Sequence, residues 1–135
     1  MSLTDDPKAV ARRFVDAINT RRLDRFDAVF ANNAKLTFSG TTMPSDPAAA
    51  RQLAESWLSV FPDWQVDLLD VVAEDDKIVL QMQWTGTHSA AVFDLAATGR
   101  VARVDEMIVF RVAGGRFVEG WEVWDEAAMR RQLTA

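Results

Sequence analysis

Apolar residues in the first part of the chain recur at the spacing of a helix. The repeat runs every three or four positions through Val10, Phe14, Ala17 and Ile18. Asp5 and Asp6 stand immediately before Pro7, and a capping carboxylate followed by proline is typical of a helix start. The pattern therefore predicts an N-terminal helix with one buried face.

Three further elements are predicted before residue 62. A short helix is expected from Leu23 to Phe30, and the alternation from Ala34 to Ser39, ending at Gly40, predicts a strand. Asp46 and Pro47 indicate the start of another helix. Its predicted apolar face consists of Ala50, Leu53, Trp57 and Phe61.

The rest of the chain alternates like a sheet. Four strands are predicted, over residues 64–74, 77–87, 100–112 and 116–124. Residues 88–99 form a less regular crossing, residues 113–115 a hairpin turn, and residues 125–133 a closing helix in which Asp125 is the N-cap.

Helices that come first and a long meander that follows are typical of the α+β class. We expect a curved antiparallel sheet wrapped round the N-terminal helices, cone-shaped with an internal pocket. The length of 135 residues fits one domain, 1–135, with little room for a second.

Composition narrows the possible functions. The net charge of −5 and the scattered arginines argue against nucleic-acid binding, which needs clustered positive charge. The absence of Cys excludes disulfides and thiolate chemistry. There is no signal-peptide pattern and no apolar run of membrane-spanning length, so a cytoplasmic protein is expected. Eight Phe and five Trp provide apolar surface for a core or for a pocket wall.

Several short sequence motifs in the second half of the chain resemble one protein family. They are FPDWQV at 61–66, DVVAEDDKIV at 70–79, WTGTH at 84–88, ATGR at 97–100 and GRFVEGWEVWD at 115–125. Together they resemble the SnoaL-like polyketide cyclases, which share the conical fold of the nuclear-transport-factor-2-like superfamily. The resemblance implies a homodimer formed through the outer face of the sheet.

The resemblance also identifies a candidate catalytic carboxylate. The family's cyclases carry an acid/base residue, usually Asp, just after a Trp of the last strand, and Glu122 occupies that position here. A His typically lies fourteen residues earlier, where this chain has Ile108. The chain therefore keeps the carboxylate and lacks its partner.

The strand pattern gives Glu122 an independent physical argument. Val118, Gly120, Glu122 and Trp124 share one strand face, because side chains alternate. A carboxyl among such neighbours loses hydration and is harder to ionise, which suits a general acid or base. The alternative is a solvated face on which Glu122 is an ordinary surface residue.

Glu106 is the second candidate, as the one acid in the run Val104, Glu106, Ile108, Phe110, Val112. A three-residue turn at 113–115 would place Glu106 directly opposite Glu122, and two facing carboxyls share a proton. A register slip of one residue would instead put the two acids on opposite faces of the sheet.

The remaining candidates concern binding. Trp57, Trp84, Phe110 and Trp124 are expected to form an apolar wall for a ligand, although core packing is the common role of each. His88, the only histidine, is expected at the rim, either as a structural hydrogen-bonding residue or in contact with ligand.

These observations favour an enzyme that uses general acid/base catalysis without a cofactor or metal. Cyclisation, isomerisation or hydrolysis of a small apolar metabolite, such as a polyketide-type ester, would each suit Glu122 as proton carrier and Glu106 as its coupled partner. Two alternatives remain: a non-catalytic binding module of the same fold, favoured by the missing histidine, and an assembly role of the sheet face.

Overall fold

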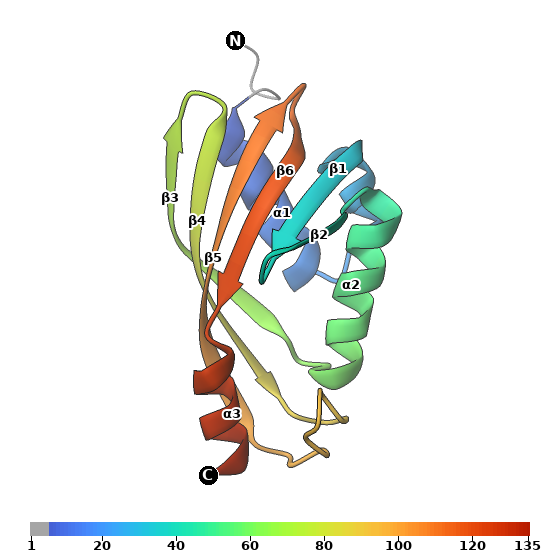
Figure 1. Ribbon diagram of the computed structural model, residues 1–135. Helices are drawn as coiled ribbons and strands as arrows, with labels where there is room; N and C mark the ends of the chain where they lie inside the picture. Colours follow the sequence, from blue (N-terminus) through green and yellow to red (C-terminus); the bar gives the residue numbers. More distant parts are fainter. Residues whose placement is uncertain (1–5) are drawn as a thin grey trace.

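The computed structural model describes residues 6–135, which form one six-stranded sheet with helices (Figure 1). The elements in chain order are α1 (Pro7–Asn19), the 3-10 helix η2 (Leu23–Ala28), β1 (Phe30–Phe38), β2 (Thr41–Pro44), α2 (Pro47–Val60), β3 (Gln65–Glu74), β4 (Lys77–Thr87), β5 (Val101–Ala113), β6 (Arg116–Trp124) and α3 (Glu126–Thr134).

Most predicted elements are present within one or two residues of their expected bounds. The side chain of Asp6 caps α1 by accepting a hydrogen bond from the Lys8 amide at 3.0 Å, whereas Asp5 lies outside the described residues. Asp125 caps α3 by accepting from the Ala128 amide at 2.9 Å. Hydrophobic periodicity and capping chemistry therefore located these helices correctly.

Differences occur in the region before α2. β1 begins at Phe30, earlier than predicted, and β2 was not predicted because its four residues are exposed or half-buried and show no apolar alternation. The helix expected from Leu23 to Phe30 is a short 3-10 helix. On α2, Leu53 is 50% exposed, and Ala54 takes a buried position in its place.

The strand order is β2-β1-β6-β5-β4-β3. All neighbouring pairs are antiparallel except β1 and β6, which run parallel. The sheet is therefore mixed rather than wholly antiparallel as expected, because the chain crosses from β2 through α2 and the meander before it returns beside β1. The predicted α+β class with a curved sheet is confirmed.

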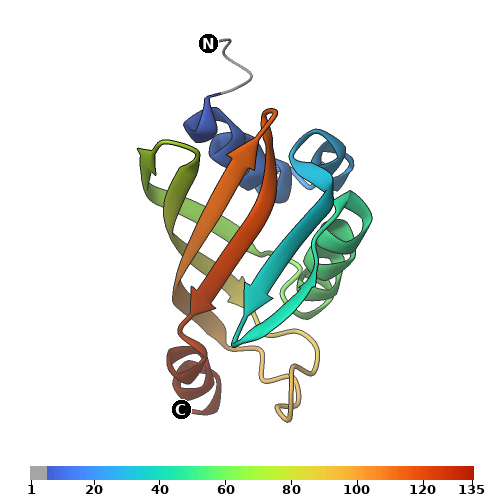
Figure 2. The ribbon, with the colours of Figure 1, turned by 45° about the horizontal axis from the view of Figure 1, so that its top comes forward.

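The sheet curves around its helices (Figures 1 and 2). Helix α1 lies against the concave face, and α2 lies alongside β1 and β2, while α3 follows the end of β6 and packs against the first residues of β5. Five phenylalanines pack together where α1 and η2 meet the sheet: Phe14, Phe26, Phe30, Phe110 and Phe117. This core closes one end of the cone and leaves space toward the other.

The β5–β6 hairpin turns through two glycines. Gly114 and Gly115 have φ angles of 58° and 74°, a left-handed conformation that glycine adopts without steric cost. The turn is thus two residues long, with Ala113 paired to Arg116. The three-residue turn predicted from sequence is wrong by one position.

Candidate active site

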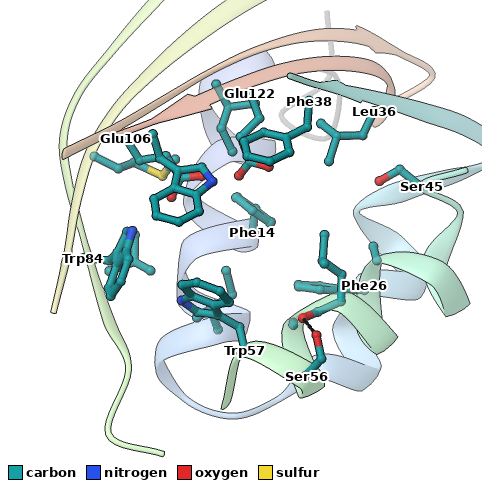
Figure 3. Close-up of a pocket in the computed structure, with 18 of the residues that line it drawn as sticks. Phe14, Phe26, Leu36, Phe38, Ser45, Ser56, Trp57, Trp84, Glu106 and Glu122 are labelled. Atoms are coloured by element: carbon teal, nitrogen blue, oxygen red, sulfur yellow. Dashed lines mark hydrogen bonds between the residues drawn. The ribbon is translucent and has the colours of Figure 1, made fainter. Parts of the chain in front are cut away.

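A cavity of about 340 Å³ lies between the concave face of the sheet and helices α1 and α2 (Figure 3). Its lining is almost entirely apolar. The lining residues include ten aromatic side chains: Phe14, Phe26, Phe30, Phe38, Trp57, Trp64, Trp84, Phe93, Phe110 and Trp124. The polar lining residues are Ser45, Ser56, Glu106 and Glu122. Its size falls at the lower end of the range for small-molecule sites, roughly 300–1,000 Å³.

Glu106 and Glu122 reach this cavity from neighbouring strands. A bulge on β6 makes Arg111 pair with Glu119, so that Ile108 lies opposite Glu122 and Glu106 lies opposite Trp124. The direct Glu106–Glu122 pairing predicted from sequence is therefore wrong by two residues. The shorter turn and the bulge each shift the register by one, and two shifts return both acids to the same face.

The two carboxyls are diagonal neighbours that interact across the strand pair. Both side chains project from the sheet into the cavity (Figure 3). Burial raises the pKa of Glu106 well above its usual value, and a hydrogen bond with Glu122 and the negative charge of Glu122 raise it further. The pair therefore holds a proton on Glu106 at a pH where an exposed glutamate would have lost it.

No basic side chain lines the cavity in the described part of the chain. The causes of the Glu106 pKa shift are burial and Glu122, with no contribution from Lys, Arg or His. Residues 6–135 also contain no cluster of His, Cys, Asp and Glu suited to a metal ion. The negative charge on the pair is thus not balanced by the residues that surround it.

The expected apolar wall forms around the acids. Trp57, Trp84 and Trp124 make a three-ring cluster with centroid separations of 5.5, 5.6 and 6.2 Å. They come from α2, β4 and β6, so they are distant in sequence. The cluster brings large apolar surfaces to the same cavity as the two carboxyls.

Phe110 lies at the other side of the cavity, over Gly120. A Cβ atom at position 120 would approach the Phe110 Cε1 atom to 2.8 Å, so only glycine leaves room for this ring. Phe110 also stacks on Phe117, with centroids 3.7 Å apart. Because of the bulge, Phe117 rather than Val118 occupies the buried position at this end of β6, which corrects the predicted face.

His88 is buried and does not line the cavity, so the predicted rim position is wrong. Its Nδ1 accepts a hydrogen bond from the Thr98 amide at 3.2 Å and lies 3.0 Å from the Thr98 hydroxyl. Its ring packs near Phe61, with centroids 5.9 Å apart. These contacts fasten the loop of residues 88–100 and make His88 a structural residue.

Phe93 is a lining residue that sequence reasoning missed. It belongs to the irregular 88–100 segment, is 57% exposed, and has a φ of 51°, which is unusual for a bulky residue. Its ring stacks near Trp124, and the Arg130 guanidinium lies 5.5 Å from its centroid. No periodicity exists in such a loop, so only the three-dimensional structure could place Phe93 at the cavity.

Ser45 and Ser56 were also missed. The Ser56 hydroxyl donates to the Leu53 carbonyl at 2.7 Å and is used within α2. The Ser45 hydroxyl has no hydrogen-bond partner in the described structure and lies on the cavity side opposite Glu106 (Figure 3). Ser45 lies just before the start of α2, where serine is a common capping residue, so the sequence offers no signal that its hydroxyl lines a cavity.

The family model for SnoaL-like polyketide cyclases matches residues 8–133. The chain belongs to this family. Ile108, where the family resemblance leads one to expect a histidine, is the direct cross-strand neighbour of Glu122 in this SnoaL-like protein. The match covers all the described elements that form the cavity. Among curated protein sequences, no match is found.

Solved structures show the same fold. AclR, a proposed hydroxylase from Streptomyces galilaeus, is 24% identical with a TM-score of 0.85, and the alignment covers 96% of each chain. IdmH, a proposed polyketide cyclase from Streptomyces antibioticus, is 23% identical with a TM-score of 0.84, covering 96% of this chain and 99% of IdmH. A proposed SnoaL-like polyketide cyclase from Jannaschia sp. CCS1 is 18% identical with a TM-score of 0.86, covering 100% and 96%.

No helix in residues 6–135 has both the length and the apolar character needed to cross a membrane.

Proposed function

We propose that this SnoaL-like chain is a cofactor-independent acid/base enzyme, acting as a single domain on a small apolar organic molecule that carries an enolisable carbonyl. The observation that carries the proposal is the Glu106–Glu122 pair, two carboxyls that lie in one apolar cavity whose described lining has no basic residue; burial and Glu122 raise the pKa of Glu106. Two carboxyls in different protonation states supply an acid and a base at the same place.

In the proposed reaction, ionised Glu122 removes a proton from the carbon next to the carbonyl of a neutral ester or ketone. Protonated Glu106 donates its proton to the carbonyl oxygen, which gives a neutral enol. If the enol is conjugated with a carbon–carbon double bond, Glu122 returns its proton to the far carbon and Glu106 takes back the enol proton, which isomerises the substrate. Alternatively, the enol carbon attacks a second carbonyl of the same molecule and closes a ring: Glu106 takes the proton from the enol oxygen, and Glu122 gives its proton to the oxygen of the attacked carbonyl. Both routes return the pair to its original protonation state.

The wall supports this chemistry by excluding water. Trp57, Trp84 and Trp124 surround the carboxyls with aromatic surface, and proton transfer between fixed groups in a dry site is faster than transfer that requires water to reorganise. The same surface selects substrates that are largely apolar. We propose cyclisation of a polyketide-type ester as the reaction that best fits both the family and the pair.

Deuterium exchange tests the proposal without knowledge of the natural substrate. The probe is 2-tetralone in deuterated buffer, and proton NMR follows the loss of signal at the carbons next to the carbonyl. The protein should accelerate exchange beyond buffer, and Glu122→Gln should remove the acceleration. Glu119→Gln, a change of the same kind on the outer face of β6, is the matched control and should leave it intact.

A non-catalytic binding module is the second candidate, and Ile108 in place of the family histidine favours it. In that case, tetralone exchange would equal the buffer rate with wild-type protein, while apolar ligands would still quench the tryptophan fluorescence of the cavity. An acceleration that survives Glu122→Gln would contradict the acid/base mechanism as written.

We also propose that the chain forms a homodimer through the outer sheet face. An apolar row crosses four strands there, with Val72 paired to Val79, Val79 to Val109, and Val109 to Trp121. Val72 is 58% exposed and Trp121 39% exposed. Sedimentation velocity should give twice the 15.1 kDa chain mass, and Trp121→Glu should give the monomer. A monomeric wild-type protein would exclude the dimer.

A further inference from the structure

The cavity carries a charge pattern that acid/base catalysis on neutral molecules does not use fully. Its lining contains two acids and no base within the described residues. Burial and Glu122 raise the pKa of Glu106, so the pair carries one negative charge over the pH range in which Glu122 is ionised and Glu106 is protonated. A carboxylate removed from water is costly unless a positive group or several hydrogen bonds balance it. No residue of the described lining supplies such a positive group.

The acid on the outer face of the same hairpin is balanced by arginine. Arg111 binds Glu119 through two nitrogens, at 2.8 and 2.6 Å. Outside the sheet, Arg130 binds Asp94 at 2.7 Å and Glu126 at 3.0 Å. These contacts occupy both arginines outside the cavity. Among the described residues, no arginine or lysine lines the cavity that holds the Glu106–Glu122 pair.

The surroundings of the pair suit an organic cation. Trp124 lies directly opposite Glu106 in the strand register, and Trp57 and Trp84 complete the three-indole cluster. Indole is the side chain that attracts cations most strongly through its π electrons. A cation held by carboxylates forms charge-assisted hydrogen bonds, roughly twice as strong as neutral ones. Apart from Ser45 and Ser56, the rest of the wall is apolar and suits a largely apolar body.

We propose that the cavity binds hydrophobic amines, with the protonated nitrogen against the Glu106–Glu122 pair and the hydrocarbon part against Trp57, Trp84 and Trp124. The ammonium group balances the single negative charge of the pair, and the proton stays on Glu106. This inference rests on the same site as the proposed function, but it does not require that the protein turns over a substrate. It assigns a second ligand class, cationic rather than neutral, and such amines compete with the carbonyl substrate.

A pair of matched ligands tests the inference by titration calorimetry at pH 7. The probes are 1-naphthylmethylamine, which is protonated at this pH, and 1-naphthalenemethanol, which has the same shape and no charge. The amine should bind at least about tenfold more tightly, equivalent to about 1.4 kcal/mol. Equal affinity for the two, or tighter binding of the alcohol, would overturn the proposal.

The buffer dependence of the binding enthalpy gives a second measurement on the wild-type protein. Repeating the amine titration in phosphate and in Tris buffer separates the enthalpy of buffer protonation from that of binding. At a pH where Glu106 is protonated in the free protein, the amine should bind as the ammonium ion with that proton retained, so the enthalpy should be the same in both buffers. Release of about one proton per amine would contradict balance of the pair's charge by the ammonium group.

Single substitutions show which side chains hold the ammonium group of the amine. Glu122→Gln and Glu106→Gln should each reduce the amine-over-alcohol preference to about twofold or less, whereas Glu119→Gln should retain it. Trp57→Leu should weaken the amine more than Trp57→Phe, because phenylalanine keeps a ring. A preference that persists in both glutamine variants would place the cation elsewhere and overturn the proposal.

The two proposals fail independently. Amine binding without tetralone exchange would reject only the proposed function, and exchange without amine preference would reject only this inference.

Discussion

The two faces of the β5–β6 hairpin treat their acids in opposite ways. On the outer face, Glu119 pairs with Arg111 and both side chains remain partly exposed to water. On the inner face, three residues further along β6, Glu122 lies near Glu106, and no arginine or lysine among residues 6–135 lines the cavity that they share. The same hairpin thus carries one acid whose negative charge is balanced by arginine and one pair of acids whose described surroundings contain no such partner.

This contrast separates a structural acid from a chemical one. An acid paired with arginine is stabilised as a carboxylate and is a poor base, because protonation would cost the ion pair. An acid buried beside a second carboxyl has a raised pKa, as Glu106 has here, and keeps its proton to a higher pH than an exposed acid. Burial alone does not distinguish the two cases. The sign of the neighbouring charge does.

The largest expected effect comes from giving the inner face the arrangement of the outer one. Ile108→Arg places a guanidinium directly across from Glu122. An opposite charge within 4–6 Å weakens a carboxylate as a base by one to three pH units, so tetralone exchange should fall about 10- to 1,000-fold. The far-ultraviolet circular dichroism spectrum verifies the fold. Undiminished exchange in a folded variant would separate Glu122 from the reaction.

An intermediate effect should follow from removing the shared proton. The pKa of Glu106 is raised in the folded state, so the native protein holds more protons than the unfolded chain above about pH 4.5, and stability decreases as pH rises toward the folded pKa. Glu106→Gln removes this loss. The variant should gain stability over wild type at pH 8 relative to pH 4, by about 1.4 kcal/mol for each unit by which the pKa is raised.

Urea denaturation at the two pH values measures this difference. Glu74→Gln, a change at an exposed position of β3, is the control and should give the same difference from wild type at both pH values. If Glu106→Gln behaves like that control, Glu106 ionises normally and the pair is not coupled.

The smallest effect is expected on the outer face. Arg111→Met removes the partner of Glu119, but the two side chains are 35% and 42% exposed, so water already screens the pair. Stability should fall by about 0.2–1 kcal/mol, and less at 1 M salt. Tetralone exchange should not change. A loss of exchange in Arg111→Met would show that the two faces are not independent.

The sequence predicted the elements of the hairpin and the identity of its two acids, because strand alternation and burial are local properties. It did not predict which residues face each other, since register depends on a two-glycine turn and a bulge whose positions leave no clear pattern. Glu106 and Glu122 nevertheless share a face. The shorter turn and the bulge each shift the strand register by one residue, and two such shifts bring the same face of β6 inward again.

Residues outside the regular elements were placed less well. His88 was expected at the rim and is buried against Thr98 and Phe61. Phe93 was not considered, although it lines the cavity. Both belong to the crossing between β4 and β5, where tertiary contacts rather than periodicity fix the backbone. The family resemblance identified Glu122 and the loss of histidine at Ile108, but not the geometry that joins them.

The inward position of Glu122 depends on two one-residue register shifts, the short turn and the bulge, and this restricts how the length of the hairpin can evolve. Loop tips usually tolerate the gain or loss of single residues. Here one residue added or removed between Ala113 and Glu119 would turn the rest of β6 over and exchange Glu122 with Trp121 or Val123 on the inner face. Homologous hairpins that keep the acid pair should therefore differ in length by even numbers, or combine an odd change with the gain or loss of a bulge.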